Sequence, residues 1–240
     1  RGFIVAGDTG TDSAGQSDFL IIKLNDSGNE IWKKTFGGTG FETALIVEQT
    51  TDGGYILAGG VQARTDATAD LNVWILKLDD NGNIVWEKTY GGDKDDRVHS
   101  GQQTSDGGYI FAGGKGDADF WVFKLDSTGN LNWEKTYGGT ESEMANSIQE
   151  TDDGGYIVAG STWSYGEGLY DVWVLKIDIY GNEAWSKSYG GANHDQAYSV
   201  RQTFDGGYVV VGYTKSFGSG EEDILILKIG ANGECNECFQ

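Results

Sequence analysis

The chain has 240 residues, enough for one large domain or two ordinary ones, and 12% of them are aromatic. Pro is absent and Gly occurs 39 times, which indicates a folded chain with many tight turns rather than a disordered one. The net charge of -20 argues against binding to nucleic acid or to an anionic membrane. No apolar run approaches the roughly 20 residues that span a bilayer, so we expect no membrane insertion.

One nine-residue motif returns through the chain. It reads DGGYILAGG, DGGYIFAGG, DGGYIVAGS and DGGYVVVGY, with a shortened first copy, RGFIVAGD. The aromatic residues of the copies lie 52, 54, 47 and 52 residues apart, at Phe3, Tyr55, Tyr109, Tyr156 and Tyr208. A period of this length predicts a repeat architecture.

Each repeat contains apolar runs of strand length in a fixed order. In the third repeat they read SGQQTS, GGYIFAGG, DFWVFKLD and LNWEKTYGG. The runs are rich in β-branched and aromatic residues, whereas Gly, Asn, Asp and Ser separate them. No segment has a helical pattern. The sequence therefore predicts an all-β chain of short strands joined by tight turns.

The turns and the third run carry further repeated residues. In DGG, the Asp side chain can bond the backbone ahead of it, and turns such as DNGN place Gly where a hairpin requires positive φ. The third run is apolar on both faces, which is typical of a strand in a sheet covered on both sides. It also carries a Lys that we expect to pair with the Asp of DGG or with turn carbonyls, at Lys23, Lys77, Lys124, Lys176 and Lys228.

Units of about 50 residues that cannot cover their own sheet faces must stack, and closing the stack into a ring gives a β-propeller. The runs GGYIVAG, DVWVLKID and GNEAW resemble the kelch type of blade in their glycine pair, acidic strand and spaced aromatic and Trp. The KTYGG segment after Trp86 and Trp133 is not part of that pattern. The repeats are also similar to DGGYIVAG repeats of uncharacterised archaeal and bacterial surface and secreted proteins.

We therefore expect a single five-bladed β-propeller of four-stranded antiparallel blades over residues 1–240. The predicted blades cover about 1–41, 42–95, 96–142, 143–194 and 195–240. Blade one lacks its innermost strand, and blade five has GECNECFQ where its Trp strand should be, so the N/C seam is irregular. A longer parent chain with more blades is an alternative. In the seam, Cys235 and Cys238 form either a local disulfide, favoured outside the cell, or two free thiols.

Loops that vary between repeats are the predicted location of a binding site. The loop STWSYGEGLY carries Trp163, Tyr165 and Tyr170 outside the repeated framework. Exposed aromatic residues can stack on a sugar ring or anchor a protein partner, although they can also cover a hydrophobic edge between blades. We add His194, which lies in a loop, and His99, which breaks the repeat, to the predicted ligand-binding residues.

Acidic residues provide two further candidate sites. Asp8, Asp12 and Asp18 could offer oxygen ligands to Ca²⁺, but they lack the DxDxDG spacing, and we predict no other cofactor. Four acids share one register before the inner strand, where we expect them to ring the channel mouth and to cap strand ends or meet Arg97 and Arg201: Glu42, Asp96, Glu143 and Asp195. A glycosidase needs two carboxylates at a set separation, and the sequence does not select a pair among its 37 acids.

Three functions remain open on these grounds. The favoured one is a non-enzymatic, secreted or cell-surface module that binds a protein or a glycan through its variable loops. A carbohydrate-active enzyme with carboxylates at the central channel is the second. The third is a structural module of a surface layer or fibre. Fold alone does not decide among them.

Overall fold

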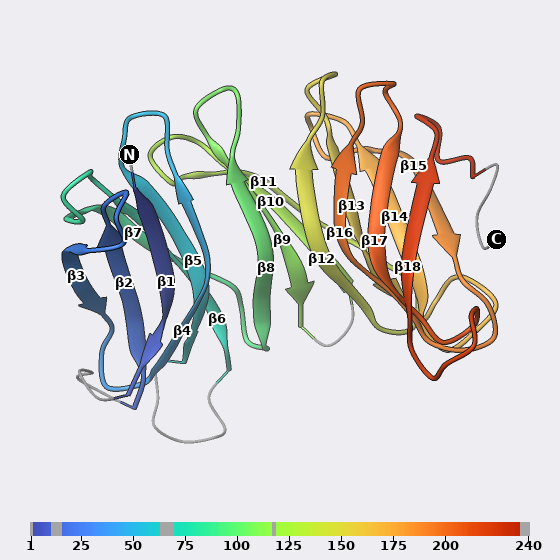
Figure 1. The fold of residues 1–240 in the computed structure, drawn as a ribbon, viewed down its shortest axis with the longest axis horizontal. Helices are drawn as coiled ribbons and strands as arrows, with labels where there is room; N and C mark the ends of the chain where they lie inside the picture. The colour runs from blue at the N-terminus through green and yellow to red at the C-terminus, as the bar shows by residue number, and fades with distance from the viewer. Residues whose placement is uncertain (1, 11–15, 63–69, 117–118, 236–240) are drawn as a thin grey trace. The chain divides into compact units, whose positions relative to one another are not determined.

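The computed structural model describes residues 2–10, 16–62, 70–116 and 119–235, which form eighteen strands and no helix (Figure 1). The strands make five antiparallel sheets, each a meander in which consecutive strands are hydrogen-bonded neighbours. Since the described residues contain no helix, they offer none that is long and apolar enough to cross a bilayer.

The first sheet contains β1 (Phe3–Thr9), β2 (Asp18–Leu24) and β3 (Glu30–Phe36). The second contains β4 (Phe41–Gln49), β5 (Tyr55–Gln62), β6 (Asn72–Leu78) and β7 (Ile84–Tyr90). The third contains β8 (Asp96–Gln103), β9 (Tyr109–Lys115), β10 (Asp119–Leu125) and β11 (Leu131–Tyr137). The fourth contains β12 (Glu143–Glu150), β13 (Tyr156–Thr162), β14 (Asp171–Ile177) and β15 (Glu183–Tyr189). The fifth contains β16 (Asp195–Gln202), β17 (Tyr208–Thr214) and β18 (Asp223–Ile229).

The two end sheets are incomplete in the way the repeats predict. The first has no strand corresponding to the first run, and the fifth has none corresponding to the Trp run within the described residues. The strands fall within the predicted blade ranges except that β4 begins at Phe41, one residue before the expected boundary.

The chain separates into two compact units. The first comprises residues 1–109 and 125–130, and the second comprises residues 110–124 and 131–240. The first unit thus contains the first two sheets, and the second contains the last two.

An ion pair between a lysine and the Asp of DGG holds the turn to its sheet in three of the repeats. Asp52 Oδ1 accepts hydrogen bonds from Thr50 Oγ1 (2.5 Å) and from the backbone N–H of Gly54 (3.0 Å). Lys77 Nζ lies 2.8 Å from Asp52 Oδ2 and also donates to the carbonyl of Leu78. The same pairing joins Lys176 to Asp153 and Lys228 to Asp205, which confirms the prediction for these lysines. Its partners hold the pKa of Asp52 down to about 2, with the Lys77 hydrogen bond as the largest cause.

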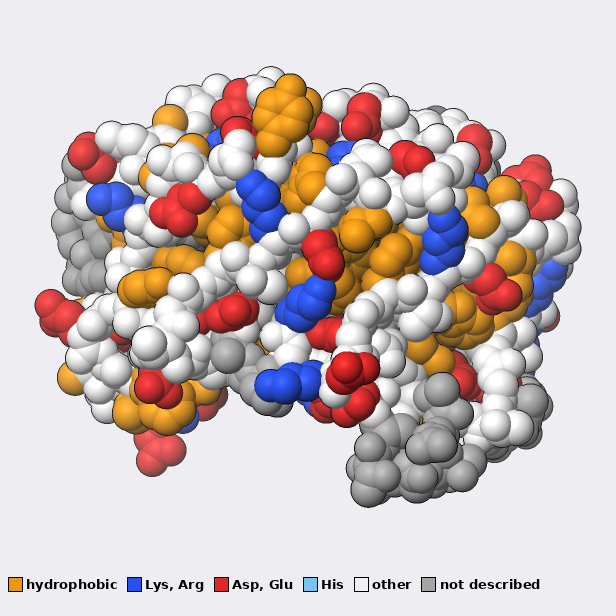
Figure 2. Space-filling view, turned by 180° about the vertical axis from the view of Figure 1, so that it is seen from behind, with side chains coloured by type: hydrophobic (Ala, Val, Ile, Leu, Met, Phe, Trp, Pro, Cys, Tyr) orange, Lys and Arg blue, Asp and Glu red, His pale blue; other side chains and the backbone are white. Residues whose placement is uncertain are grey.

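Successive sheets stack through two faces that recur in every repeat. We define the leading face of a sheet as the face that carries the second and fourth residues of the strand formed by the third run, such as Val172 and Val174 on β14. The trailing face is the opposite one. In the second unit, the leading face of the fourth sheet packs against trailing-face residues of the fifth, including Tyr208, Val210 and Leu227. The same arrangement joins the third sheet to the fourth, and the first to the second. Hydrophobic side chains also reach the surface in several patches, with single charged side chains scattered among them (Figure 2).

The fourth strand of a sheet contacts a turn of the next sheet through a Trp and a Tyr, and we call this contact the clasp. Trp133 Nε1 donates to the carbonyl of Ile179 (3.2 Å), and Tyr137 Oη donates to the carbonyl of Gly181 (2.6 Å). The Trp133 ring also lies 6.2 Å from that of Tyr156, centroid to centroid. Because Gly181 has φ of 75° and a Cβ there would lie 2.9 Å from the Trp133 ring, the turn needs Gly for two reasons. Equivalent clasps start from Trp86 and Trp185.

Candidate functional site

The candidate site lies in the connection from β13 to β14, in the second unit. Thr162 Oγ1 accepts hydrogen bonds from the backbone N–H groups of Ser164 (3.1 Å) and Tyr165 (3.2 Å). At the other end of the loop, Asp171 Oδ2 accepts from the N–H groups of Glu167 (2.9 Å) and Gly168 (3.2 Å). Both polar side chains are buried, so the loop has a fixed start and a fixed end.

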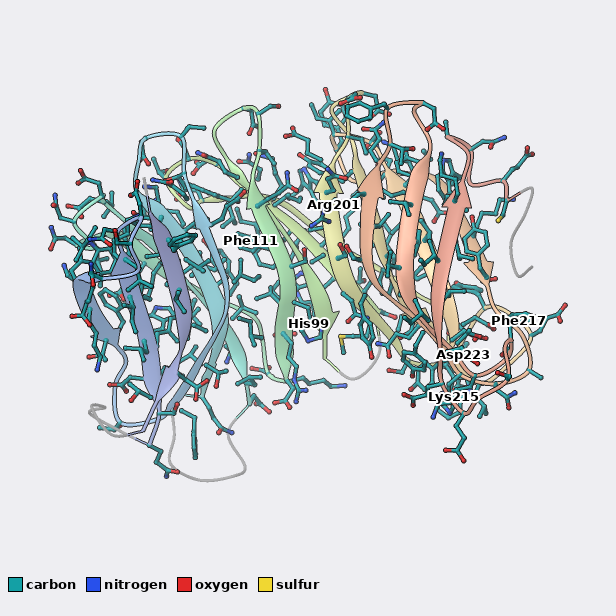
Figure 3. The ribbon with its side chains drawn as sticks, viewed as in Figure 1. His99, Phe111, Arg201, Lys215, Phe217 and Asp223 are labelled. Atoms are coloured by element: carbon teal, nitrogen blue, oxygen red, sulfur yellow. The ribbon has the colours of Figure 1, made fainter. Side chains whose placement is uncertain are left out.

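The connection from β17 to β18 repeats this loop (Figure 3). Thr214 Oγ1 accepts from the N–H groups of Ser216 (3.0 Å) and Phe217 (3.2 Å), and Asp223 Oδ2 accepts from Gly220 (3.1 Å). The two segments, TWSYGEGLYD and TKSFGSGEED, therefore share a T-x-S-aromatic-G-x-G-x-x-D pattern. Sequence reasoning treated both loops as variable, although an alignment of the two segments would have revealed the common scaffold.

The two loops differ at the positions that face outward. In the β13–β14 loop, the rings of Trp163 and Tyr170 lie 5.4 Å apart, centroid to centroid. In the β17–β18 loop, Lys215 and Glu222 occupy the same positions and form an ion pair of 2.9 Å. One scaffold thus carries an aromatic pair in one repeat and a charged pair in the next.

The aromatic pair continues into a third ring. Tyr170 and His194 are stacked, with ring centroids 5.5 Å apart and an interplanar angle of 23°. We call the rings of Trp163, Tyr170 and His194 the aromatic platform. Trp163 is 47% exposed, and both other rings are partly exposed. The structure thus brings together three of the five residues predicted to bind a ligand.

Tyr165 belongs to the loop scaffold instead. Its ring lies 5.3 Å from that of Trp173, and its hydroxyl donates to the carbonyl of Gly138 (2.8 Å). A Cβ added to Gly139 would lie 3.3 Å from the Tyr165 hydroxyl, and a Cβ added to the equivalent Gly191 would lie 3.2 Å from the ring of its counterpart, Phe217. Tyr165 also lines a cleft of about 470 Å³ together with Tyr137, Trp173, Glu183 and Lys187.

The other predicted site residues lie apart from the platform. His99 is on β8, in the first unit (Figure 3). Asp8 accepts a hydrogen bond from Ser17 (3.3 Å), Asp18 is buried at the start of β2, and Asp12 lies outside the described residues, so the Ca²⁺ site stays a prediction. Among the described residues, no group of three or more His, Cys, Asp or Glu could hold a metal ion.

The cysteine prediction is likewise open. Cys235 is disulfide-bonded. Cys238 lies outside the described residues, so the pairing of the two stays a prediction.

The repeated acids are buried capping groups. Their carboxylates accept a backbone hydrogen bond from the second glycine of a GG pair: Glu42 from Gly38, Asp96 from Gly92, Glu143 from Gly139 and Asp195 from Gly191. All four side chains are at most 3% exposed. Arg97 bonds to Asp95, and Arg201 bonds to Ser147 Oγ and to the carbonyl of Val200, so the alternative that the acids meet these arginines stays a prediction.

Each of these carboxylates lies beside a second acid or amide. That second residue is the first one of the strand formed by the third run in the preceding sheet. A Cβ added to Gly190 would overlap Asp171 Oδ1 and lie 2.8 Å from Asp195 Oδ2, so the two oxygens flank the same glycine. Burial raises the pKa of Asp171, and the Asp195 charge adds to this effect. Sequence reasoning missed these partners because they lie about 24 residues upstream, on a different sheet.

No protein-family model matches the chain, and no curated protein sequence does. Solved structures do resemble it, and two of them have a TM-score above 0.5. Sqt1 from Chaetomium thermophilum has a TM-score of 0.52 at 14% identity, over 98% of this chain and 56% of that one. An exo-beta-1,3-galactanase from Bifidobacterium bifidum has a TM-score of 0.51 at 13% identity, over 95% of this chain and 84% of that one.

At these identities the likeness shows the fold alone. This chain spans little more than half the length of Sqt1. Both neighbours are propeller-type folds, and the five antiparallel sheets fit five blades. The predicted fold class, an all-β protein of the five-bladed propeller type, is therefore confirmed.

Proposed function

We propose that the chain is a non-enzymatic binding module that holds a glycan on the aromatic platform. The observation that carries this proposal is the contiguous run of three partly exposed rings, two of which lie on a loop whose backbone is fixed at both ends. In the matching loop of the fifth sheet, the same backbone carries an ion pair, so the scaffold itself does not require the rings.

Stacked rings suit a sugar because its C–H face is apolar while its hydroxyl groups stay at the edges, where they can form hydrogen bonds. Two exposed polar residues are close to the platform residues in the sequence: Glu167 is on the same loop as Tyr170, and Asn193 directly precedes His194. A neutral or basic glycan is favoured, since the net charge of -20 disfavours acidic ones.

One observation favours binding without catalysis. The repeated carboxylates are buried and accept hydrogen bonds from backbone N–H groups, so they cannot reach a substrate in this conformation. The likeness to a galactanase supports the fold and carries no catalytic residues to this chain. We further propose that the protein acts outside the cell or at its surface, which the disulfide bond at Cys235 supports.

Replacing the platform by its own counterpart tests the proposal. We expect the double variant Trp163→Lys, Tyr170→Glu to keep the fold, because these side chains form an ion pair on the same scaffold in the fifth sheet. On a glycan array, the wild-type protein should bind a defined set of glycans, and the double variant should lose at least tenfold in affinity for them. Lys215→Ala with Glu222→Ala is the matched control and should bind as the wild type does.

Glycan binding that survives in the platform variant would overturn the assignment of the site. If the protein binds no glycan on the array but captures a protein ligand through the platform, the ligand of the site is a protein and the glycan part of the proposal is wrong. Turnover of a chromogenic glycoside would contradict the non-enzymatic part of the proposal.

A further inference from the structure

A cleft of about 540 Å³ lies between the fourth and fifth sheets, beside their DGG turns. All the residues that line it belong to the second unit. Trp185 of the fourth sheet and Tyr208 of the fifth form its aromatic wall, with ring centroids 6.0 Å apart. A cleft of this size can hold a small molecule or a long side chain of a partner.

The charged lining of the cleft is mainly acidic. It consists of one ammonium group and three carboxylates, those of Lys176, Asp152, Asp153 and Asp178. Asp153 already pairs with Lys176 (3.0 Å). The backbone N–H of Asp152 donates to Gln202 (2.9 Å), whereas its exposed carboxylate has no hydrogen-bond or ion-pair partner among the described residues. The other DGG turns carry uncharged residues at the position of Asp152: Thr51, Ser105 and Phe204.

The Tyr208 hydroxyl lies at this acidic part of the cleft. Tyr208 is 2% exposed, and its hydroxyl has no hydrogen-bond partner within the part of the chain that the structure describes. Burial raises the pKa of Tyr208, and the nearby charges of Asp153 and Asp152 add to this effect. Since a phenol oxygen can accept a hydrogen bond, the cleft offers a buried acceptor close to carboxylates.

The equivalent cleft of the first unit, between the first and second sheets, shows how a cation fits. Tyr55 lines that cleft at the position of Tyr208, and Lys23 lines it at the position of Lys176. Lys23 Nζ lies 5.2 Å from the centroid of the Tyr55 ring, which is a cation–π contact. Lys176 instead binds Asp153, so the ring of Tyr208 has no such cation among the described residues.

We propose that the cleft between the fourth and fifth sheets binds a primary alkylammonium group, carried by a lysine side chain or by a free polyamine. The ammonium group donates to the Asp152 carboxylate and the Tyr208 hydroxyl, and its alkyl chain packs on the Trp185 ring. An organic cation fits better than a metal ion, because no three acids in the described ranges are grouped so as to hold one. The net charge of -20 attracts cations of this kind.

The ammonium site is separate from the aromatic platform. Asp152 and Asp153 precede β13, whereas Trp163 and Tyr170 lie in the connection that follows it. The two sites are therefore at opposite ends of a seven-residue strand, which is about 20 Å long. Amine binding does not depend on the proposed glycan binding.

A nuclear magnetic resonance titration of the full chain tests the proposal. The probes are Nα-acetyl-lysine amide, which carries the ammonium on a lysine side chain, and spermidine, which is a free polyamine. At least one of them should bind and shift the indole N–H signal of Trp185, and the tighter one identifies the source of the ammonium. Nα,Nε-diacetyl-lysine amide lacks the charge and should not bind. Added NaCl should weaken the binding of both amines, because salt screens their attraction to the carboxylates.

Two variants test the residues assigned to the site. Asp152→Asn should weaken amine binding at least fivefold, because it removes the carboxylate that has no partner of its own. Tyr208→Phe should weaken it at least twofold through the loss of the hydroxyl, and Phe3 at the equivalent position of the first sheet shows that the fold accepts this change. Glu221→Gln is the matched control. It also removes one negative charge, but it lies in the connection from β17 to β18, at the other end of the strand from Tyr208, and should bind like the wild type.

Equal weakening in Asp152→Asn and Glu221→Gln would show that net charge alone attracts the amine and would overturn the proposal. A Trp185 signal that moves with neither probe would overturn it as well. The platform variant Trp163→Lys, Tyr170→Glu keeps the net charge and should bind amines like the wild type. Failure of the ammonium site is therefore distinguishable from failure of the glycan proposal.

Discussion

At the scale of single residues, Asn72 shows that a neutral side chain can take the place of the buried acids at the start of the third run. Asn72 stands at the start of β6 where the other sheets have Asp18, Asp119, Asp171 and Asp223. A Cβ added to Gly91 would overlap Asn72 Oδ1 and lie 2.7 Å from Asp96 Oδ2, which matches the arrangement around Gly190. The side-chain amide of Asn resembles a protonated carboxyl group, and neither carries a charge. The second sheet therefore always has a neutral group at this position, whereas the other sheets have one only when the Asp is protonated.

The effect of pH on stability follows from this comparison. Asp171 is 2% exposed, its Oδ1 has no hydrogen-bond partner among the described residues, and burial raises its pKa above 3.8. An acid with a raised pKa binds protons more tightly in the folded state. Its contribution to stability is therefore complete at low pH and is lost as the pH rises through the raised pKa.

We predict that Asp171→Asn becomes progressively more stable relative to the wild type as the pH rises from about 4 through the raised pKa of Asp171. The variant keeps an oxygen for the N–H groups of Glu167 and Gly168 and cannot lose a proton. Urea unfolding at a series of pH values measures the difference. Asp126→Asn is the control, because the pKa of Asp126 is lowered and its pH dependence lies below 3.8, leaving a constant difference over this range. A constant difference for Asp171→Asn would contradict the argument.

At the scale of elements, the clasp between a fourth strand and the next turn explains the KTYGG segment, which lies outside the kelch pattern. Lys135 Nζ donates to Asn182 Oδ1 (2.7 Å), and Tyr137 Oη donates to the carbonyl of Gly181 (2.6 Å). The same two bonds start from Lys88 and Tyr90. The repeat therefore encodes contacts between sheets as well as the strands themselves.

We predict a large loss of stability for Trp133→Ala and a small one for Tyr137→Phe. The first change removes a ring packed on Gly181 and near Tyr156 and should lower the free energy of unfolding by about 3 kcal/mol. The second removes one hydrogen bond and should cost about 1 kcal/mol. The first sheet already has Phe36 at this position, so the fold tolerates the change. Urea denaturation followed by circular dichroism provides both values. Equal losses of unfolding free energy in the two variants would contradict the prediction.

At the scale of the whole molecule, the period of the repeat was sufficient to predict all-β structure, five sheets and two incomplete end sheets. It also predicted the pairing of Lys77 with Asp52, because a lysine in register on a buried strand must meet an anion. The aromatic platform was only partly predictable. Trp163, Tyr170 and His194 lie on two connections, and their contact depends on how the fourth and fifth sheets pack. The scaffold role of Tyr165 required comparison with Phe217, which is 52 residues away in the sequence.

Net charge sets the last prediction, in which two electrostatic effects oppose each other. The chain has 37 acidic and 17 basic residues, so compact folding concentrates negative charge, and salt should relieve that repulsion. Salt also weakens exposed ion pairs such as Lys115–Glu134, but such pairs contribute only about 0–1 kcal/mol each. The repulsion should therefore dominate, and the melting temperature at neutral pH should rise with NaCl concentration. Thermal unfolding followed by circular dichroism over a series of NaCl concentrations measures the effect, and a melting temperature that falls with salt would show that the ion pairs outweigh the net charge.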